Sequence, residues 1–187
     1  MRLFIATPLT AEVERYLGKV INDLRPHGPG VKWVESKNIH VTLRFLGETD
    51  EALVPKLKAL VSEVAAAHVP AVTELDRLGG FPNLNRPRVL WVGLAGGIEE
   101  LSKMARQLEL AARQLRFEPE SKGFKAHLTL GRVRSDDKLG GLRTHIEGYP
   151  LEKMSMTLNR IVLFKSTLTP RGPIYDRLHE AKLGAAE

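Results

Sequence analysis

The sequence predicts an α+β fold in which two similar lobes enclose a central cleft. Helical and extended patterns alternate along the 187 residues, and the order of a strand, a helix and further strands occurs twice. The segments His40–Leu43 and His127–Leu130 repeat one pattern, His-x-Thr-x, at comparable places in the two halves. No linker rich in Pro, Gly or Ser separates the halves, so we expect residues 1–187 to form one domain made of two internally duplicated lobes.

The first half of the chain carries the patterns of two helices and several strands. A stripe of apolar residues at helical spacing ends at Pro26, where the segment HGPG breaks the pattern. A second amphipathic stretch has Pro55 near its beginning, which leaves its first turn open. The elements expected here are strands around residues 3–5 and over 31–34, 39–46, 72–78 and 89–94, and helices over 13–24 and around 57–64.

The third helix has the clearest pattern of the chain. Its apolar stripe runs from Ile98 to Leu115, with Glu, Arg and Lys at the other positions. A strand over 126–133 follows, and then a polar segment with glycines that reaches Tyr149. Two further strands are expected near 156–164 and 174–178.

The composition limits the function classes without naming one. With 43% hydrophobic residues, the chain can bury a sizeable core. The lack of cysteine excludes disulfides, thiolate metal sites and a cysteine nucleophile, and it fits the cytoplasm. The opening MRLFIATPLT is too short for a signal-peptide core, and no stretch approaches the length of a membrane span, so no membrane partner is expected. The net charge of +6 favours a polyanionic partner such as nucleic acid.

The repeated motif itself indicates acid–base chemistry. In an extended strand, side chains at i and i+2 leave one face, so each motif places its histidine and threonine together above an aliphatic underside. Two such strands side by side would aim two imidazoles and two hydroxyls at one point. Chance would give roughly 0.3 His-x-Thr matches in a chain of this composition, so two matches inside strand-like runs are informative. Imidazole titrates near neutral pH, which suits proton transfer on a phosphate.

Five segments carry a resemblance that runs nearly end to end. They are RLFIATPL, VKWVESKNIHVTLRFLGET, FPNLNRPRVLWVGL, FKAHLTLGRVR and LFKSTLTPRGPIYDRL. In this order, and with the paired His-x-Thr-x signature, the chain resembles the RNA 2′,3′-cyclic phosphodiesterase branch of the 2H phosphoesterases, once described as 2′-5′ RNA ligases. The resemblance implies two pseudo-symmetric lobes, each an antiparallel β-sheet with helices packed outside, that face each other across a V-shaped groove. It also implies an enzyme without metal, ATP or other cofactor that opens a terminal 2′,3′-cyclic phosphate to a 2′-phosphomonoester.

The same resemblance implies a role for each motif residue. His40 matches the proton donor to the departing 3′ oxygen, and His127 matches the proton acceptor that activates water. Thr42 and Thr129 match hydroxyls that hold the non-bridging phosphate oxygens. This division suits an in-line attack, because such an attack needs a proton removed on one side of phosphorus and another delivered on the opposite side.

Arg132 stands five residues after His127, where the family commonly has an arginine that contacts the phosphate. Strict strand alternation sends Arg132 to the face opposite His127, where it would be a solvated surface charge. A bulge at Gly131 would return it to the face of His127, because glycine permits the required backbone.

Alternation in the first motif makes two further predictions. It places Arg44 beside His40 and Thr42, at the rim of the cleft and within reach of an RNA backbone. It places Phe45 on the core side, where packing is expected rather than stacking on a base.

Other functions fit parts of the pattern. A binding module could capture phosphorylated RNA ends without turnover, and a related enzyme could act on a small cyclic phosphate such as ADP-ribose cyclic phosphate. If a 5′-hydroxyl replaces water, the same displacement joins RNA through a 2′-5′ linkage without ATP, although water at high concentration should win. A zinc site is disfavoured, because two histidines with threonines and no carboxylate pattern make a poor ligand set.

The remaining expectations concern the partner and the other histidines. The implied partner is RNA that ends in a 2′,3′-cyclic phosphate, with tRNA halves as one source, and a cytoplasmic monomer is expected. The other four histidines are expected to be structural: His27 lies in a turn, His68 ends a helix before Pro70, and His145 and His179 lie in polar surroundings.

Overall fold

The structure is a computed structural model that describes residues 1–135, 139 and 141–184. The strands in the described part are β1 (Arg2–Pro8), β2 (Val31–Trp33), β3 (His40–Glu48), β4 (Ala71–Phe81), β5 (Val89–Ala95), β6 (His127–Val133), β7 (Ser155–Leu158), β8 (Arg160–Thr169) and β9 (Gly172–Lys182). The α-helices in the same part are α1 (Ala11–Leu24), α2 (Val54–Ala67), α3 (Ile98–Gln114) and α4 (Leu142–Glu147).

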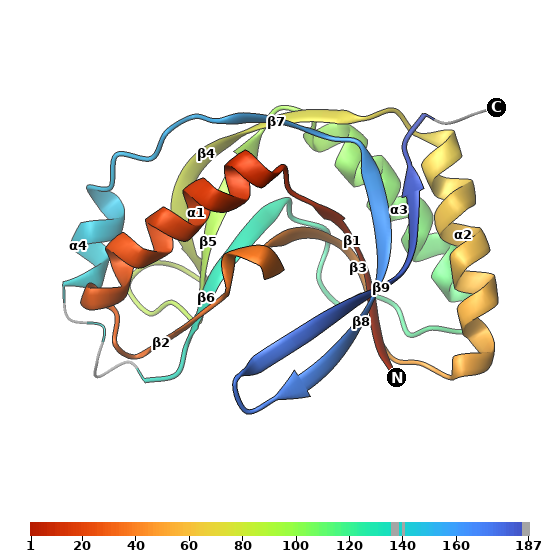
Figure 1. Ribbon diagram of the computed structural model, residues 1–187, viewed down its shortest axis with the longest axis horizontal. Coiled ribbons are helices and arrows are strands. Elements are labelled where there is room, and N and C mark those ends of the chain that lie inside the picture. The colour runs from red at the N-terminus through yellow and green to blue at the C-terminus, as the bar shows by residue number, and fades with distance from the viewer. Residues whose placement is uncertain (136–138, 140, 185–187) are drawn as a thin grey trace.

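The strands form two antiparallel sheets, and each sheet takes strands from both halves of the chain. The first sheet has the order β3-β1-β8-β9 and the second has the order β2-β6-β5-β4-β7. The sheets meet at β3 and β6, where Cα atoms approach within 8 Å, near the centre of the arch in Figure 1. The predicted α+β class with antiparallel sheets is confirmed, and β8 and β9 from the end of the chain complete the sheet that β1 and β3 begin.

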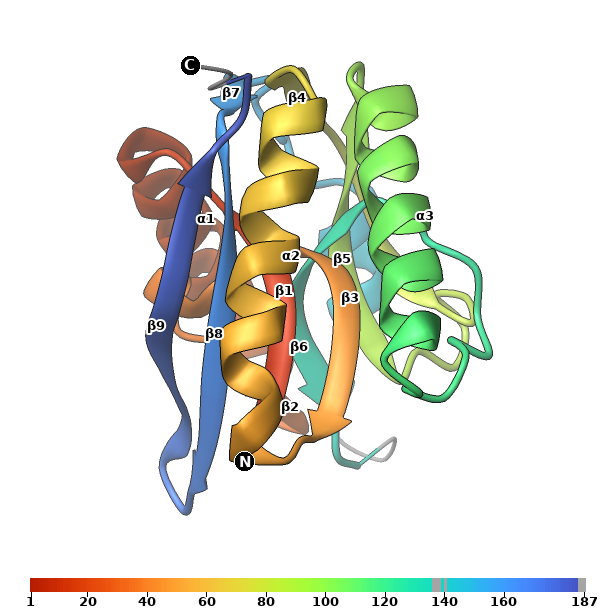
Figure 2. The same cartoon turned by 90° about the vertical axis from the view of Figure 1, so that its right-hand side faces the viewer.

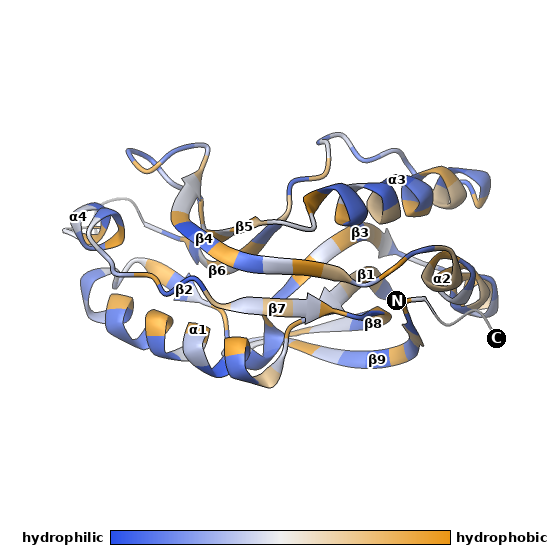
Figure 3. Ribbon diagram, turned by 90° about the horizontal axis from the view of Figure 1, so that it is seen from above, coloured by the Kyte–Doolittle hydropathy of each residue, from blue (hydrophilic) through white to orange (hydrophobic). Residues whose placement is uncertain are grey.

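Helices pack on the sheets through apolar stripes. Helix α2 contacts β8 and β9, and α3 contacts β3 and β4. Figure 2 shows α2 and α3 side by side in front of the strands. Helix α1 packs against α4, and Figure 3 places α1 and α3 on opposite sides of the strands. The buried stripe of α3 consists of Leu101, Met104, Ala105, Leu108 and Ala112. Burying one such leucine contributes about 1.5–3 kcal/mol, so these stripes fix where the helices sit.

The two faces of the first sheet have different neighbours. In β1, Leu3 and Ile5 belong to the large core cluster, whereas Phe4 and Ala6 belong to a separate small cluster. Alternation along a strand explains this division. The face that carries Phe4 and Ala6 is therefore turned away from the core.

Two elements differ from the sequence prediction. The polar segment before Tyr149 contains α4, which buries only Leu142 and Ile146, one turn apart and too short a pattern to predict. The strand expected near 156–164 is two strands, β7 and β8. The first ends before Asn159, the second begins after it, and they belong to different sheets.

Across the described ranges, no helix combines the length and apolar character that crossing a membrane requires.

Candidate active site

The two His-x-Thr-x segments begin β3 and β6 and alternate as the sequence predicts. His40 and Thr42 are half-buried, while the aliphatic residues that follow each of them are fully buried. His127 and Thr129 in β6 repeat the same pattern. A positive charge on His127 lowers the pKa of His40, after the larger effect of burial, so the two rings lie within electrostatic reach of each other. Strands β3 and β6 also approach each other closely, so the structure brings both motifs to the place where the two sheets meet, which we call the groove.

The same hydrogen bond holds both rings. Nδ1 of His40 lies 2.8 Å from the carbonyl oxygen of Asn38, and Nδ1 of His127 lies 2.6 Å from the carbonyl oxygen of Lys125. A carbonyl oxygen only accepts hydrogen bonds, so Nδ1 is the donor in each ring. This arrangement fixes the tautomer and leaves Nε2 of each histidine as the nitrogen that can exchange a proton with a bound molecule.

Aromatic side chains enclose His40. Phe4 stacks on its ring with centroids 4.8 Å apart, and Tyr175 meets it nearly edge-on at 5.5 Å. Burial lowers the pKa of His40 from 6.5 to about 4, and the hydrogen bond to Asn38 offsets part of that decrease. His40 is therefore neutral at pH 7 in the free protein.

His127 lies in a more open and more positive environment. Burial lowers its pKa, the hydrogen bond to Lys125 acts in the opposite direction, and the charges of Arg132 and Lys125 lower it further. Phe81 meets the ring edge-on, with centroids 5.1 Å apart and planes at 84°. A phosphate bound between the histidines would favour the protonated form of either ring, because an opposite charge stabilises it.

A register shift brings Arg132 to the face of His127. Strand β6 shifts against β5 beside Gly131, so that Leu130 is skipped in the pairing with β5. Because of this shift, Arg132 and His127 lie on the same face of β6, which strict alternation would not allow. The shift lies beside Gly131, where the sequence analysis placed a possible bulge. The charge of Arg132 also reaches Tyr175 of β9, where it opposes the increase in pKa that burial causes. Arg132 is thus placed in the groove, and its contact with phosphate stays a prediction.

The first motif carries the same kind of shift, and there it overturns two predictions. Strand β3 shifts against β1 at Leu43, so Phe45 shares the face of His40 while Arg44 turns to the core. Phe45 is 53% exposed and Arg44 is 4% exposed. Both predictions were wrong because a strand with a bulge does not alternate through it. Phe45 and Arg132 now occupy matching positions, each five residues after its motif histidine.

Buried Arg44 binds the segment that precedes the second motif. Its Nε lies 2.7 Å from Oε2 of Glu109 as an ion pair, and its Nη1 lies 3.1 Å from Oε1 of Glu120. Its Nη2 donates to the carbonyl oxygen of Glu118 at 2.6 Å. Glu120 also accepts a hydrogen bond from the backbone N–H of Phe45 at 3.2 Å. Arg44 therefore ties β3 to α3 and to the loop that leads into β6, and it does not line the groove.

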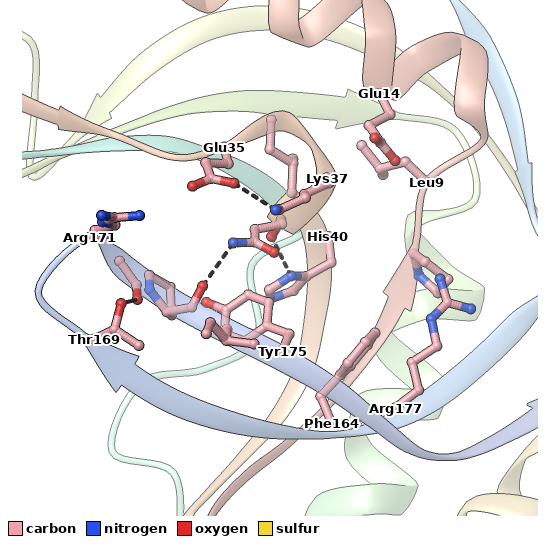
Figure 4. A pocket seen from close by; sticks show the side chains of 16 residues that line it. Leu9, Glu14, Glu35, Lys37, His40, Phe164, Thr169, Arg171, Tyr175 and Arg177 are labelled. Carbon is pink, nitrogen blue, oxygen red and sulfur yellow. Dashed lines mark hydrogen bonds and ion pairs between the residues drawn. The ribbon is translucent and has the colours of Figure 1, made fainter.

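A cavity of about 490 Å³ opens beside His40, between the start of β3 and the hairpin of β8 and β9. Figure 4 shows Tyr175 and Phe164 next to His40 in its wall. Asn38 joins its two sides by donating to the carbonyl oxygen of Pro173 at 3.1 Å. The other charged residues in the lining are Glu14, Glu35, Lys37, Arg171 and Arg177. The cavity has the size of a small-molecule site and carries both signs of charge.

The remaining histidines have partners of their own. Nε2 of His68 lies 2.7 Å from Oε1 of Gln107, and Nε2 of His179 lies 2.7 Å from Oγ of Ser62. His27 and His145 stack on each other with ring centroids 3.4 Å apart.

The sequence did not single out three aromatic residues that stand near the motifs. Phe81 and Trp91 lie in FPNLNRPRVLWVGL, and Tyr175 lies in LFKSTLTPRGPIYDRL. Both segments carry the family resemblance, so an aromatic residue within them was the available signal.

Comparison with known sequences identifies relatives over most of the chain. The family model described as LigT-like phosphoesterase matches twice, over residues 8–91 and 92–175. An RNA 2′,3′-cyclic phosphodiesterase of Aquifex aeolicus is 36% identical over 155 residues, which covers 82% of each chain. One of Methanocaldococcus jannaschii is 34% identical over 181 residues, which covers 96% of this chain and 99% of its own.

Solved structures are similar over the same extent. A protein of Thermus thermophilus superposes with a TM-score of 0.83 and 29% identity, with 100% of both chains covered. E. coli LigT complexed with 3′-AMP superposes with a TM-score of 0.71 and 27% identity, with 97% of both chains covered. Each of the two family matches contains one His-x-Thr-x motif.

Proposed function

The chain belongs to the LigT-like phosphoesterase family, and from this membership and the geometry of the groove we propose that it is an RNA 2′,3′-cyclic phosphodiesterase. The proposed reaction opens a terminal 2′,3′-cyclic phosphate to a 2′-phosphomonoester. The observation that carries the proposal is the pair of histidines at one groove, each with Nδ1 bound to a carbonyl oxygen and Nε2 left for proton transfer.

The two histidines are proposed to act on opposite sides of phosphorus. Nε2 of His127 accepts a proton from water as the water oxygen attacks the phosphorus. Nε2 of His40 donates a proton to the 3′ oxygen as its bond to phosphorus breaks, and the 2′ oxygen stays bonded. A positioned acid or base typically contributes about 10²–10⁴-fold to the rate, so the pair accounts for much of the catalysis.

Three further side chains are proposed to hold the non-bridging oxygens. Thr42 and Thr129 each share a face with a motif histidine, so their hydroxyls can donate to the same phosphate. Negative charge grows on these oxygens during the attack, and fixed donors stabilise it most at that stage. Arg132 adds a guanidinium that can bind two oxygens at once.

The terminal nucleoside is proposed to bind on the His40 side of the phosphate. His40 is assigned to the 3′ oxygen, so the ribose that carries this oxygen lies next to it. The cavity of about 490 Å³ beside His40 can receive this nucleoside. Phe45, with 53% of its surface exposed, offers a ring at the same face for contact with a base.

The substrate, the location and the oligomeric state are proposed from the sequence. The net charge of +6 supports RNA as the substrate, with tRNA halves as one source. The lack of cysteine supports the cytoplasm, and a monomer suffices because both motifs lie in one chain. Joining of RNA ends through a 2′-5′ linkage is proposed as a reversible side reaction.

The product distinguishes this function from its alternatives. An oligonucleotide with a 2′,3′-cyclic end should yield a 2′-phosphate, because the 3′ oxygen is the one that leaves. Phosphorus NMR or separation of the isomers after digestion to nucleotides measures the ratio. Product that is only 3′-phosphate would contradict the proposal. Turnover of ADP-ribose cyclic phosphate with little activity on RNA would indicate the small-molecule enzyme, and binding without product would indicate an RNA-end binder.

The pH dependence of hydrolysis follows from the pKa values of the two histidines. Burial lowers both below 6.5, that of His40 to about 4. The protonated form of His40 is lost as pH rises through its pKa, and the neutral form of His127 is lost as pH falls through its own. The plot of kcat/KM against pH, which reports the free enzyme, should therefore be bell-shaped with its optimum below pH 6.5.

Bound phosphate should move this profile. Its negative charge favours both protonated rings, so the optimum of kcat, which reports the complex, should lie at higher pH than that of kcat/KM. A kcat/KM that stays constant or rises between pH 6.5 and 8 would contradict the assignment of a buried, neutral His40 as the acid.

A further inference from the structure

The second sheet carries an aromatic pair beside His127 that the proposed hydrolysis does not use. Phe81 at the end of β4 and Trp91 in β5 have ring centroids 5.1 Å apart with planes at 35°. Phe81 also lies 5.1 Å from His127, measured between ring centroids. Trp91 pairs with Thr129 across the ladder, so it shares the groove face, while its neighbours along β5 are buried in the core. Both aromatic residues are only partly buried.

Two glycines allow the indole of Trp91 to lie flat on the sheet. A Cβ at Gly79 would lie 2.3 Å from Cη2 of Trp91, and a Cβ at Gly93 would lie 3.1 Å from Cζ3. Gly79 is the partner of Trp91 on β4, and Gly93 is the partner of His127 on β6. The ring therefore covers backbone where two side chains would otherwise stand. The indole therefore lies against the backbone of β4 and β5 and stays partly exposed.

Positive groups stand around this aromatic surface. Nζ of Lys125 lies 5.3 Å from the ring centroid of Phe81. The register shift of β6 puts Arg132 on the same face. Aromatic rings beside cations bind unpaired nucleobases by stacking and their phosphates by charge. The chemistry of the surface thus fits a nucleoside within a nucleic acid strand.

The position of the pair relative to the histidines decides which nucleoside it receives. In the proposed function, on which this step rests, the terminal nucleoside lies beside His40 and the nucleophile enters beside His127. We infer that Phe81 and Trp91 form a stacking subsite for the nucleoside that carries an entering 5′-hydroxyl. The subsite serves the 2′-5′ joining that is already proposed as a side reaction, and the reverse cleavage of that linkage.

The joining step is balanced without ATP. The 5′ oxygen forms a bond to phosphorus and gives its proton to Nε2 of His127. The bond from phosphorus to the 3′ oxygen breaks, and that oxygen takes a proton from Nε2 of His40. Cleavage runs these steps backward, so the 5′-hydroxyl nucleoside leaves from the aromatic surface.

The test compares two substrates in a Trp91→Leu variant. A 2′-5′-linked adenosine dinucleotide occupies the subsite, whereas adenosine 2′,3′-cyclic phosphate does not reach it. The KM for cleaving the dinucleotide, divided by the KM for hydrolysing the cyclic phosphate, should rise about tenfold, because stacking contributes on this scale for each base. Phe81→Leu should move the ratio in the same direction.

Trp33→Leu is the matched control, since Trp33 is the other tryptophan of the chain. Its ring lies against Gly28 and Gly131, whereas that of Trp91 lies against Gly79 and Gly93. A ratio that changes equally in both tryptophan variants, or in neither, would overturn the subsite. So would a wild-type enzyme that hydrolyses cyclic phosphates but neither forms nor cleaves 2′-5′ linkages. A wild-type enzyme that hydrolyses no cyclic phosphate at all would instead reject the proposed function.

Two further measurements cover the remaining outcomes. If Trp91→Leu weakens hydrolysis of a cyclic-ended oligonucleotide more than that of the mononucleotide, the ring binds the body of the substrate strand, and the inference is wrong. If the variant does not fold, Trp33→Phe leaves Trp91 as the sole tryptophan. Adding the 2′-5′ dinucleotide should then quench its fluorescence saturably, and adding the cyclic mononucleotide should not.

Discussion

Replacing His40 or His127 with alanine is expected to lower kcat/KM for cyclic-phosphate RNA by about 10²–10⁴-fold, because each removes one positioned proton carrier. The decreases in kcat/KM of the two single variants should not multiply in the double variant. Once one proton transfer is missing, the other histidine has little left to assist, so the double variant should resemble the slower single variant. Steady-state kinetics with an oligonucleotide of defined end measures all three proteins.

The residual pH profiles of these variants test which histidine is acid and which is base. His40→Ala should lose the decrease of activity at high pH, and His127→Ala should lose the decrease at low pH. The opposite pattern would reverse the assignment and leave the pair intact. His179→Ala is the control, because that ring binds Ser62 on α2 and its loss should leave the kinetics near those of the wild type. Loss of less than tenfold in both motif variants would reject two-histidine catalysis.

Replacing Arg44 with methionine is expected to destabilise the fold by about 3 kcal/mol, because it leaves the carboxylates of Glu109 and Glu120 without their buried partner. This loss of stability is at the low end for a broken buried ion pair, because the side chains of Glu109 and Glu120 are 18% and 34% exposed. For a chain of this length that corresponds to a decrease in Tm of roughly 6–12 °C. Urea denaturation and thermal unfolding measure it.

Arg132→Met is the matched control and should show the opposite pattern. Arg132 is exposed at the groove, so its loss should change the stability by less than about 0.5 kcal/mol. Its loss should lower kcat/KM by roughly 10–100-fold if the guanidinium holds phosphate, on the scale of a hydrogen bond to a charged group. A fully stable Arg44→Met protein with salt-dependent loss of RNA binding would restore the prediction that the structure overturned.

The strands and helices were predictable where a regular pattern runs long enough. The stripe of α3 continues over several turns, and nearly all of the expected element was found. Helix α4 was missed, because two buried residues one turn apart do not distinguish a helix from a loop. The exchange of strands between sheets was also beyond reach, since β7 and β8 are separated by Asn159 alone and carry no mark of their sheets.

The sequence alone determined the family, the α+β class and the two histidine–threonine pairs, because these depend on residue identity and on alternation over three or four positions. Only the tertiary structure decided which side chains face the groove beyond each pair. Gly131 permits the shift in β6 without requiring it, and no glycine marks the shift in β3 at Leu43. Each shift reverses every side chain after it. The shift in β6 put Arg132 into the groove, and the shift in β3 buried Arg44 and exposed Phe45. Cross-strand partners set these registers, and they come from segments distant in the chain.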